Sequence, residues 1–479
     1  MLEGLEISEV YSSTILLEDD KRIDPDFYSK SYLNLIQKIS NGIELGKMSE
    51  TYELHSNGAF KDVFNYLHNF DSKDIPYIRS ENVGKFFIDG DLDYISNYAH
   101  SNLQKTKTQI GDIITARTGK VGGASIITKE WVNCNSNQNV VNIRLNNNYS
   151  ISPFFLTTFL NTKYGIQQFQ KSSTGNVQPW LNLTLLRKVK VPLISDIFQN
   201  KIENVVVEAN DLRNEYKNQY SQAEAILLKE IGLFNFQPSK EPINIKSFKS
   251  SFGVTKRLDA EYYQKKYEQI IEKIVTQKHE YLINIVEISK SIEPGSNHYT
   301  EDKGLPFYRV ADYNKFGLSK PDKELTASFV ADNKDLIEKL KPKKGTILFS
   351  KDGSVGTAYL LRNDLDGITS GAILHLQVKN KKEILPEYLT LALNSKLVQM
   401  QAERDAGGSI ILHWRKEEIE QVVVPIIDFK KQEQIAVLVE ESFKLKFESE
   451  RLLEVAKKAV EIAIEESEDV ALKYLSNQL

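Results

Sequence analysis

The sequence contains very little cysteine and no long hydrophobic run. Its single cysteine, Cys134, excludes an internal disulfide and any zinc site built from several cysteines. The seven histidines do not cluster at the spacing of metal ligands. No apolar run reaches the length of a transmembrane helix, and the acidic, polar N-terminal stretch is unlike a signal peptide. We therefore expect a cytoplasmic protein with no membrane contact and no metal site of its own.

Motifs of the common nucleotide-dependent enzymes are also absent. The glycine-rich loop before Gly119 resembles a phosphate-binding loop, but Ile114 stands where such a loop needs glycine and Val121 where it needs serine or threonine. No Asn-Pro-Pro-aromatic or Asp-Pro-Pro-aromatic sequence occurs, which excludes an adenine methyltransferase site. A loose match to a nuclease pattern near Asp322 has no counterpart in the first half of the chain. The sequence therefore favours a binding scaffold, and we assign no catalytic residue.

Charge is distributed unevenly along the chain. Residues 101–200 carry eleven Lys or Arg against three Asp or Glu, whereas residues 1–100 carry nine against eighteen. The whole chain has a formal net charge of −4. A local basic region in an acidic protein is expected where one surface meets a polyanion. Charge alone equally fits solvated side chains that are spread over several faces.

Two long helical segments organise the chain. From Asp196 to Gly232 there is no proline and no internal glycine, and small or apolar residues recur with the 3-4-3-4 spacing of a coiled-coil seam. At about 1.5 Å per residue this helix spans about 54 Å, roughly the length of 16 base pairs of DNA. The pattern returns from Lys431 onward, so we expect the two helices to pair in antiparallel fashion. Polar residues interrupt the seam at Gln219, Glu230, Ser442 and Ser449.

The rest of the chain is one sequence unit that occurs twice. From Ser152 onward the two copies stay in register at a constant offset of 233 residues. Many dissimilar residue types keep this register, which chance does not explain. The corresponding segments are Arg22–Tyr28 and Arg257–Tyr263, Ile75–Arg79 and Leu305–Arg309, Gly111–Gly122 and Gly345–Gly356, Ser152–Lys163 and Leu385–Lys396, and the residues Gln199 and Gln432.

Each copy predicts the same mixture of strands and helices. Short β-rich stretches at 75–78, 112–116 and 140–145 precede a helix that begins at Pro153, and similar stretches precede a helix at Pro386. We expect a mixed α/β fold with pseudo-two-fold symmetry, in which two antiparallel coiled-coil helices separate two similar globular domains. The expected boundaries are 1–195 for the first domain, 196–234 for the central helix, 235–428 for the second domain and 429–479 for the C-terminal helix.

Two loops of the first copy carry side chains that suit duplex DNA. Arg117 and Lys120 accompany glycines that permit close approach to a phosphate or a guanine edge. Asn176 and Gln178 are of the types that pair with adenine, and Trp180 can stack. Two alternatives remain open, since the first loop also fits a plain hairpin turn and Trp180 a core anchor. The candidate DNA-binding residues are Arg79, Arg117, Thr118, Lys120, Asn176, Gln178 and Trp180 in the first copy, and Arg309, Lys351, Ser354, Arg404, Trp414 and Arg415 in the second.

Together these features resemble the specificity subunit of Type I restriction–modification systems. The shared pattern is a glycine followed by leucine, then Val-Pro-Leu or Val-Pro-Ile, then glutamine and a long helix, with the whole unit duplicated. The glycine strands Gly-Asp-Ile-Ile and Gly-Thr-Ile-Leu and the Arg-Leu-Asp-Ala-Glu-Tyr-Tyr segment add to the resemblance, which covers essentially the full length. The pattern is carried by Gly175 to Pro192 with Gln199, and by Gly408 to Pro425 with Gln432 and Gln434.

The resemblance implies a non-catalytic subunit with two target-recognition domains, each of which reads one half of a bipartite site in double-stranded DNA. Its partners would be two adenine-N6 methyltransferase subunits and, in a restriction system, endonuclease subunits that translocate DNA. S-adenosylmethionine, ATP and Mg²⁺ are then expected on those partners and no cofactor on this chain. The acidic Glu18–Asp20 stretch departs from the symmetry because the second copy lacks it. Contacts with the methyltransferase subunits are expected along the helices, at Leu212, Tyr216, Tyr220, Leu445 and Leu452.

Two other functions fit the same residues. The recognition chain of a two-chain restriction enzyme of the Type II kind, or a stand-alone nuclease, is one alternative. A stand-alone DNA-binding protein, such as a repressor, is the other. A metal-dependent cleavage assay on the purified chain tests the first, and co-purification of a methyltransferase argues against the second.

Overall fold

The computed structural model describes residues 8–17, 23, 25–52, 75–119, 121–174, 179–181, 183–300, 303–407 and 411–479. The chain divides into two compact units, and each is described by itself. The first unit contains Met1–Arg213 and Phe447–Leu479, and the second contains Asn214–Lys446. The first unit is therefore assembled from both ends of the chain, and each unit includes part of each long helix.

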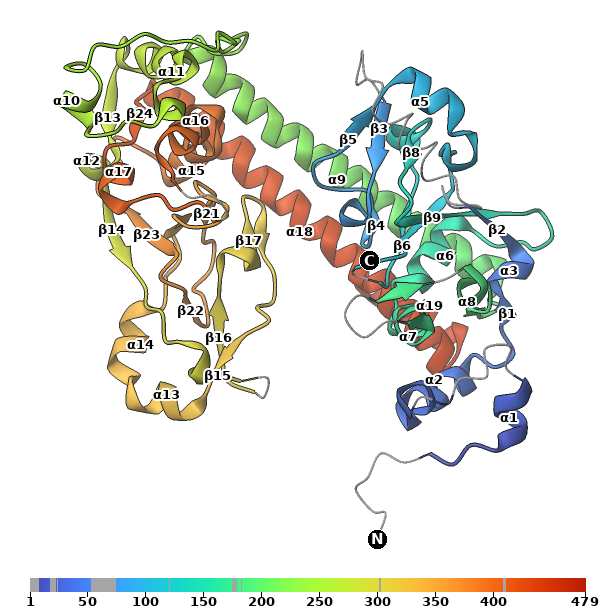
Figure 1. The fold of residues 1–479 in the computed structure, drawn as a ribbon. Coiled ribbons are helices and arrows are strands. Elements are labelled where there is room, and N and C mark those ends of the chain that lie inside the picture. Colours follow the sequence, from blue (N-terminus) through green and yellow to red (C-terminus); the bar gives the residue numbers. More distant parts are fainter. Residues whose placement is uncertain are drawn as a thin grey trace. The chain divides into compact units, whose positions relative to one another are not determined.

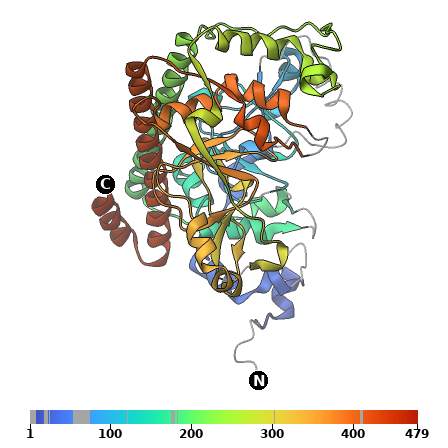
Figure 2. The same ribbon diagram turned by 90° about the vertical axis from the view of Figure 1, so that its left-hand side faces the viewer.

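Both long helices are confirmed. Helix α9 runs Asp196–Glu230 and α18 runs Phe429–Glu465. Gly232 follows α9 with a φ of 68°, the left-handed conformation that glycine adopts just beyond a helix. We expected one helix to continue to the C-terminus, but a separate helix, α19, runs Glu468–Gln478 (Figure 2). The reason is Ser467, whose hydroxyl accepts a hydrogen bond from the first turn of α19 and so caps a new helix.

In the first unit the two long helices run antiparallel. The Ser449 hydroxyl on α18 donates a hydrogen bond to the Ala209 carbonyl on α9 at 2.6 Å. Ser195, directly before α9, donates its amide to the carboxylate of Glu468, directly after α18, at 3.0 Å. The start of one helix therefore lies beside the end of the other.

The second unit repeats this arrangement with the other halves of the helices. The Ser442 hydroxyl donates to the Tyr216 carbonyl at 2.9 Å, and Lys431 pairs with Glu230 at 3.1 Å. The prediction that Ser442 and Ser449 interrupt the seam is wrong. Both serines are buried and donate a hydrogen bond across the helix pair, because a small side chain lets the two backbones approach closely.

The first unit is built on a five-stranded sheet in the order β2-β9-β6-β7-β4 and a three-stranded sheet in the order β5-β3-β8 (Figure 1). We call the β5-β3-β8 sheet with helix α5 the small lobe of this unit. The expected strands at 75–78 and 140–145 are confirmed. The strands are β1 Ile43–Glu44, β2 Ser49–Tyr52, β3 Ile75–Ile78, β4 Phe86–Phe87, β5 Asp93–Ile95, β6 Ile113–Ala116, β7 Ser125–Ile126, β8 Asn135–Ser136, β9 Val140–Leu145, β10 Ser173–Thr174, β11 Trp180–Leu181 and β12 Lys190–Val191.

The second unit has a four-stranded sheet in the order β14-β23-β20-β21 and another in the order β15-β19-β16-β22. The latter sheet with helices α13 and α14 is its small lobe (Figure 1). The strands are β13 His279–Tyr281, β14 Val286–Lys290, β15 Tyr299–Thr300, β16 Leu305–Tyr308, β17 Tyr313–Asn314, β18 Gly317–Leu318, β19 Glu324–Leu325, β20 Ile347–Ser350, β21 Ala358–Leu360, β22 Ile368–Thr369, β23 Ile373–Val378 and β24 Val423–Pro425.

Shorter helices cover the sheets. Proline begins the helix after β9 and the helix after β23, as expected, because its fixed φ suits the first helical turn. The first unit contains α1 Ser12–Leu17, α2 Lys30–Lys38, α3 Leu45–Met48, α5 Asn97–Asn102, α6 Pro153–Leu160, α7 Lys163–Ser172 and α8 Leu183–Arg187. The second contains α10 Phe252–Thr255, α11 Lys265–Val275, α12 Leu282–Ile285, α13 Ala327–Asp332, α14 Lys334–Leu340, α15 Pro386–Asn394, α16 Lys396–Asp405 and α17 Lys416–Glu420.

Equivalent side chains make the same hydrogen bonds in both repeats. Asn161 accepts from the Ala124 amide at 3.2 Å and donates to the Ala124 carbonyl at 2.8 Å. Asn394 makes the same pair of bonds with Ala358, at 3.0 and 2.8 Å. The duplication seen in the sequence therefore extends to buried polar contacts, which depend on geometry and not on hydrophobic pattern.

The core of each unit joins the larger sheet to the helix pair. In the first unit, buried residues of α6 and α9, such as Phe155 and Ile202, pack in one cluster with Leu452 and Ala456 of α18. The corresponding cluster of the second unit combines β20 and α15 with residues 220–233 and with the first turns of α18. The helices are thus part of both cores. None of the helices in the part of the chain that is described here is long and apolar enough to cross a membrane.

Candidate nucleic-acid interface

A glycine turn follows the central strand of each larger sheet. In the first unit β6 leads into Arg117–Gly119, and in the second β20 leads into Lys351–Gly353. Gly119 and Gly353 have φ of 80° and 72°, and a Cβ at either position would meet no atom within 4 Å. Both turns are therefore open to the surroundings at the glycine. Glycine suits them because an L side chain rarely adopts that backbone conformation.

Each turn pairs with a segment from far along the chain. The Leu181 amide donates to the Arg117 carbonyl at 2.9 Å, and the Trp414 amide donates to the Lys351 carbonyl at 2.7 Å. Leu181 and Trp414 are therefore equivalent, since they make the same bond to equivalent turns. We expected Trp180 to be the partner of Trp414, and this alignment is wrong by one residue.

The shift of one residue changes the candidate residues. Successive side chains of an extended segment point to opposite faces, so a residue next to a buried one faces outward. Trp414 is 1% exposed and packs on Phe349 with ring centroids 5.8 Å apart, so the structure removes it from the DNA-binding candidates. Its neighbour His413 is exposed and forms a bridge with Asp352, as Trp180 does with Thr118.

In the first unit the turn and its partner segment form a stacked pair. The guanidinium carbon of Arg117 lies 4.4 Å from the centroid of the Trp180 ring. This distance is typical of a cation–π contact, which holds the planar guanidinium parallel to an aromatic face. Trp180 remains 38% exposed. Arg117, Thr118 and Trp180 are thus brought together at the surface of the first unit.

The second unit carries a different set of groups at the same place. Asp352 Oδ1 lies 2.9 Å from His413 Nδ1, and its other carboxylate oxygen pairs with Lys351. The side chain of His413 is 64% exposed. Sequence reasoning missed His413, and the only signal for it was the constant offset of 233 residues, which aligns position 413 with position 180.

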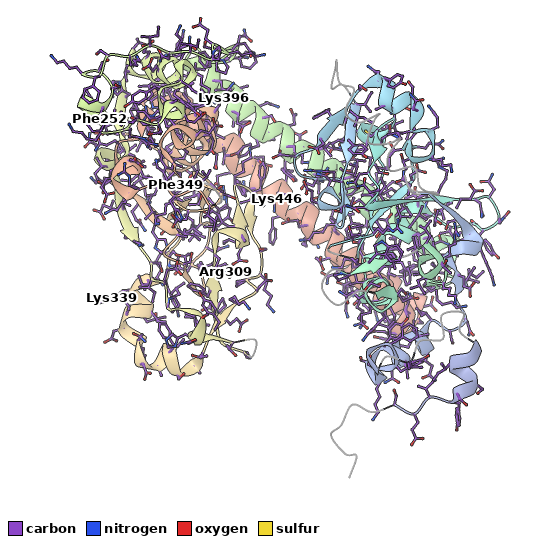
Figure 3. All side chains as sticks on the ribbon, in the orientation of Figure 1. Phe252, Arg309, Lys339, Phe349, Lys396 and Lys446 are labelled. Atoms are coloured by element: carbon purple, nitrogen blue, oxygen red, sulfur yellow. The ribbon has the colours of Figure 1, made fainter. Side chains whose placement is uncertain are left out.

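Arg79 and Arg309 occupy equivalent positions at the ends of β3 and β16. Each precedes a short 3₁₀ turn, and each backbone amide donates to a side chain three residues later, Asn82 Oδ1 at 2.9 Å or Asp312 Oδ2 at 2.7 Å. Figure 3 labels Arg309 near the end of β16. The guanidinium groups pair with acids of the small lobes, Arg79 with Glu81 and with Asp93 at 3.1 Å, and Arg309 with Asp322 at 3.8 Å.

A short loop connects these arginines to the glycine turns in both units. The loop bonds the end of one strand of the small lobe and the start of the turn, so the two candidate regions are adjacent. In the first unit the Asn137 amide donates to the Ile78 carbonyl at 2.9 Å and the Arg117 amide to Asn139 at 2.8 Å; in the second the Ser370 amide donates to Tyr308 at 2.8 Å and the Lys351 amide to Ala372 at 2.9 Å.

The remaining candidates of the second unit differ in exposure. Arg415 is exposed and pairs with Glu418. Arg404 is mostly buried and donates to Asp405 at 2.6 Å. Burial raises the pKa of the Asp405 carboxyl, and the hydrogen bond from Arg404 opposes this shift. Arg404 therefore serves first as the partner of a buried carboxyl. Ser354 accepts a hydrogen bond from Ser350 through its carbonyl and lies in the glycine turn region.

Three candidates, Lys120, Asn176 and Gln178, lie outside the described residues, as do Gly175, Gly408 and the Glu18–Asp20 stretch. Among the residues that the structure does describe, no group of three or more histidines, cysteines or acids is arranged to hold a metal ion.

Three of the residues expected to contact partner subunits are buried within their own unit. Tyr216 and Tyr220 belong to the core side of α9 in the second unit, where both rings pack on Phe316. Leu452 belongs to the core cluster of the first unit. The expectation is therefore corrected for these three, because the apolar stripe of each helix faces its own domain. Leu212 and Leu445 are partly buried.

Comparison with known proteins gives one family. Residues 282–456 match the Type I restriction modification DNA specificity domain. The match spans most of the second unit, from α12 into α18, and it confirms there the resemblance to Type I specificity subunits. A search of curated proteins gives no match.

Solved structures of three Type I proteins are similar over most of the chain. One is the S subunit of a Type I restriction-modification system from M. genitalium, at 14% identity and a TM-score of 0.37, covering 90% of this chain and 94% of that one. Another is the HsdS subunit from Thermoanaerobacter tengcongensis, at 13% identity and a TM-score of 0.28, with 89% and 96% covered. The third comes from work on complex assembly and conformational transition of the type I R-M system, at 13% identity and a TM-score of 0.28, with 91% and 96% covered.

Proposed function

We propose that this chain, which contains a Type I restriction modification DNA specificity domain, is a DNA specificity subunit in which each repeat reads one half of a bipartite target. The observation that carries the proposal is the glycine turn with its exposed partner residue. The same backbone frame occurs in both units, yet it presents Thr118 with Trp180 in one and Asp352 with His413 in the other. A shared frame with different polar groups suits two readers of unlike half-sites.

The chemistry of the two pairs differs in a way that bases distinguish. A guanidinium held flat on an aromatic ring, as Arg117 is on Trp180, can present two parallel donors to the O6 and N7 acceptors of guanine. A carboxylate such as Asp352 accepts from the amino group of cytosine, while His413 and Lys351 offer donors beside it. Glycines at the turns allow the backbone to approach a phosphate.

The proposal includes two adenine-N6 methyltransferase subunits that dock on the long helices and, in a restriction system, endonuclease subunits. S-adenosylmethionine, ATP and Mg²⁺ would bind to those partners, since adenine must be flipped into a dedicated catalytic pocket. The helices retain exposed apolar side chains that suit docking, namely Val207 on α9 and Val437 and Phe447 on α18. These replace the buried Tyr216, Tyr220 and Leu452 as candidates.

An exchange of readers tests the proposal. Residues 22–195 are replaced by those of a relative that has a different target, and the assembled methyltransferase is assayed on a DNA library. We expect one half of the methylated site to change and the other to stay the same. A change in both halves, or in neither, contradicts the assignment of one reader to each repeat.

Single substitutions in the two exposed pairs should act on separate halves of the site. Trp180→Ala is expected to lose about 1–3 kcal/mol of discrimination in the first half only, because the guanidinium loses its stacking surface. His413→Ala should affect the second half only. Binding to variant half-sites at fixed salt measures both effects. Tyr98→Ala, at an exposed aromatic residue elsewhere in the first unit, is the matched control.

A further inference from the structure

A buried arginine on α9 contacts the small lobe of the first unit. Arg213 Nη2 donates to the Ile88 carbonyl at 2.7 Å and lies 3.2 Å from Asp89 Oδ1. Its guanidinium is also 5.4 Å from the Phe87 ring. The Arg213 side chain is 8% exposed, whereas that of Asp89 is 69% exposed. The bond to the carbonyl therefore matters more than the ion pair, which solvent screens.

The segment held by Arg213 is bonded directly to the turn that begins at Arg79. Asn82 is buried and donates through its side-chain amide to the carbonyls of Asp89 and Asp91, at 3.1 and 2.9 Å. The same side chain accepts from the Arg79 amide at 2.9 Å. A continuous path of hydrogen bonds thus runs from the helix, through Asn82, to a candidate DNA-binding arginine.

The second repeat has a cation at the equivalent helix position. Lys446 follows Arg213 by 233 residues, on α18 (Figure 3). Its Nζ lies 3.6 Å from the point where a Cβ would stand at Gly317, in the β17–β18 hairpin. This hairpin also packs on α9 through Phe316, whose ring centroid is 4.9 Å from that of Tyr220.

The hairpin of the second unit is likewise bonded to its arginine. The Ser319 amide, just after β18, donates to the Asp312 carbonyl at 2.8 Å. Asp312 is buried and accepts from the Arg309 amide at 2.7 Å. Lys315 strengthens the contact with the helix, since its Nζ lies 3.4 Å from Glu224. Different side chains therefore build the same mechanical path in both repeats.

We propose that Arg213 is a positioning residue, which holds the small lobe of the first repeat at a set orientation on α9, and that Phe316 does so for the second repeat. The inference rests on the proposed function, since orientation matters only if the lobes read DNA. Because base contacts require hydrogen-bond geometry, a small rotation of the lobe reduces discrimination more than it reduces contact with phosphates. The two residues are specificity determinants although neither is exposed to a base.

The test compares Arg213→Met, Arg213→Lys and Phe316→Leu in the full chain assembled with its methyltransferase partner. Binding is measured on duplexes that carry changes in one half-site, at a temperature where circular dichroism finds each variant folded. We expect Arg213→Met to reduce discrimination in the first half at least tenfold and to leave the second half unchanged. Arg213→Lys should restore most of it, because lysine serves at the equivalent position 446. Phe316→Leu should show the converse pattern.

Lys201→Met, at an exposed lysine on the same helix, is the matched control and should alter neither half. The proposal is overturned if folded Arg213→Met keeps full discrimination, or if it weakens binding equally on every sequence. It is also overturned if Phe316→Leu acts on the first half. A wild-type complex that shows no preference at either half would instead refute the proposed function, so the two failures are distinguishable.

Discussion

Replacing Gln432 by alanine is expected to destabilise the second unit strongly. The side chain is fully buried near the start of α18. Its carbonyl accepts from the Leu385 amide at 3.0 Å, and its amide donates to the carbonyls of Glu383 and Ile427 at 3.1 and 3.0 Å. Since buried groups left without partners each lose about 1–3 kcal/mol, we expect a loss of roughly 2–4 kcal/mol. Urea denaturation followed by circular dichroism measures it.

Gln434→Ala provides the matched control for this experiment. Gln434 lies on the same turn of the helix but is exposed, so its replacement should change stability by less than about 0.5 kcal/mol. Gln199 makes the equivalent bonds in the first unit, to the amide of Ser152 and the carbonyls of Ser150 and Ile194. Equal effects of the substitutions at 432 and 434 would mean that these bonds do not hold the helix to its domain.

Acid should destabilise the second unit through His375. This residue is buried on β23, between Ser289 and Leu348 on the neighbouring strands, and its Nε2 is 2.8 Å from Thr369 Oγ1. Burial lowers the pKa of His375 from 6.5 to about 4. The unfolded chain therefore binds a proton more readily than the folded chain between these two values. Stability is fully present above pH 6.5 and falls as the pH drops toward 4, by up to about 3 kcal/mol.

His375→Asn is the informative variant because asparagine occupies the equivalent position, 142, in the first repeat. There Asn142 accepts from the Ser136 hydroxyl at 2.7 Å, so the pocket accommodates an amide in that repeat. The difference in unfolding free energy between wild type and variant should shrink steadily from pH 7 to pH 4. His413→Asn, at an exposed histidine, should leave the pH profile of stability unchanged. A constant difference between wild type and His375→Asn at every pH would contradict the prediction.

Much of the fold could be predicted from the sequence because its signals are local or repeated. The absence of proline and glycine from 196 to 231 predicted α9, and Gly232 predicted where it ends. Proline at 153 and at 386 marked two helix starts correctly. Gln199 and Gln432 were noted as markers of the family, and the structure adds the physical reason, which is their bonding of helix to domain.

The candidate site was harder to predict because it depends on register between distant segments. Aligning Trp180 with Trp414 matched two large aromatic residues, yet the backbone bonds to Arg117 and Lys351 align Trp180 with His413. Chemical similarity is a poor guide where one repeat buries its tryptophan and the other exposes it. Sequence periodicity likewise placed Tyr216 and Tyr220 on a helix stripe without indicating that the β17–β18 hairpin covers them.

The order of the units along the chain has a consequence for synthesis. The second unit is one continuous segment, 214–446, whereas the first combines the start of the chain with residues 447–479. Leu452, Ala456 and Ala459, which complete the core of the first unit, are among the last residues to leave the ribosome. The half that is translated first therefore cannot finish packing until translation ends, while the half that follows it already contains every residue of its own core.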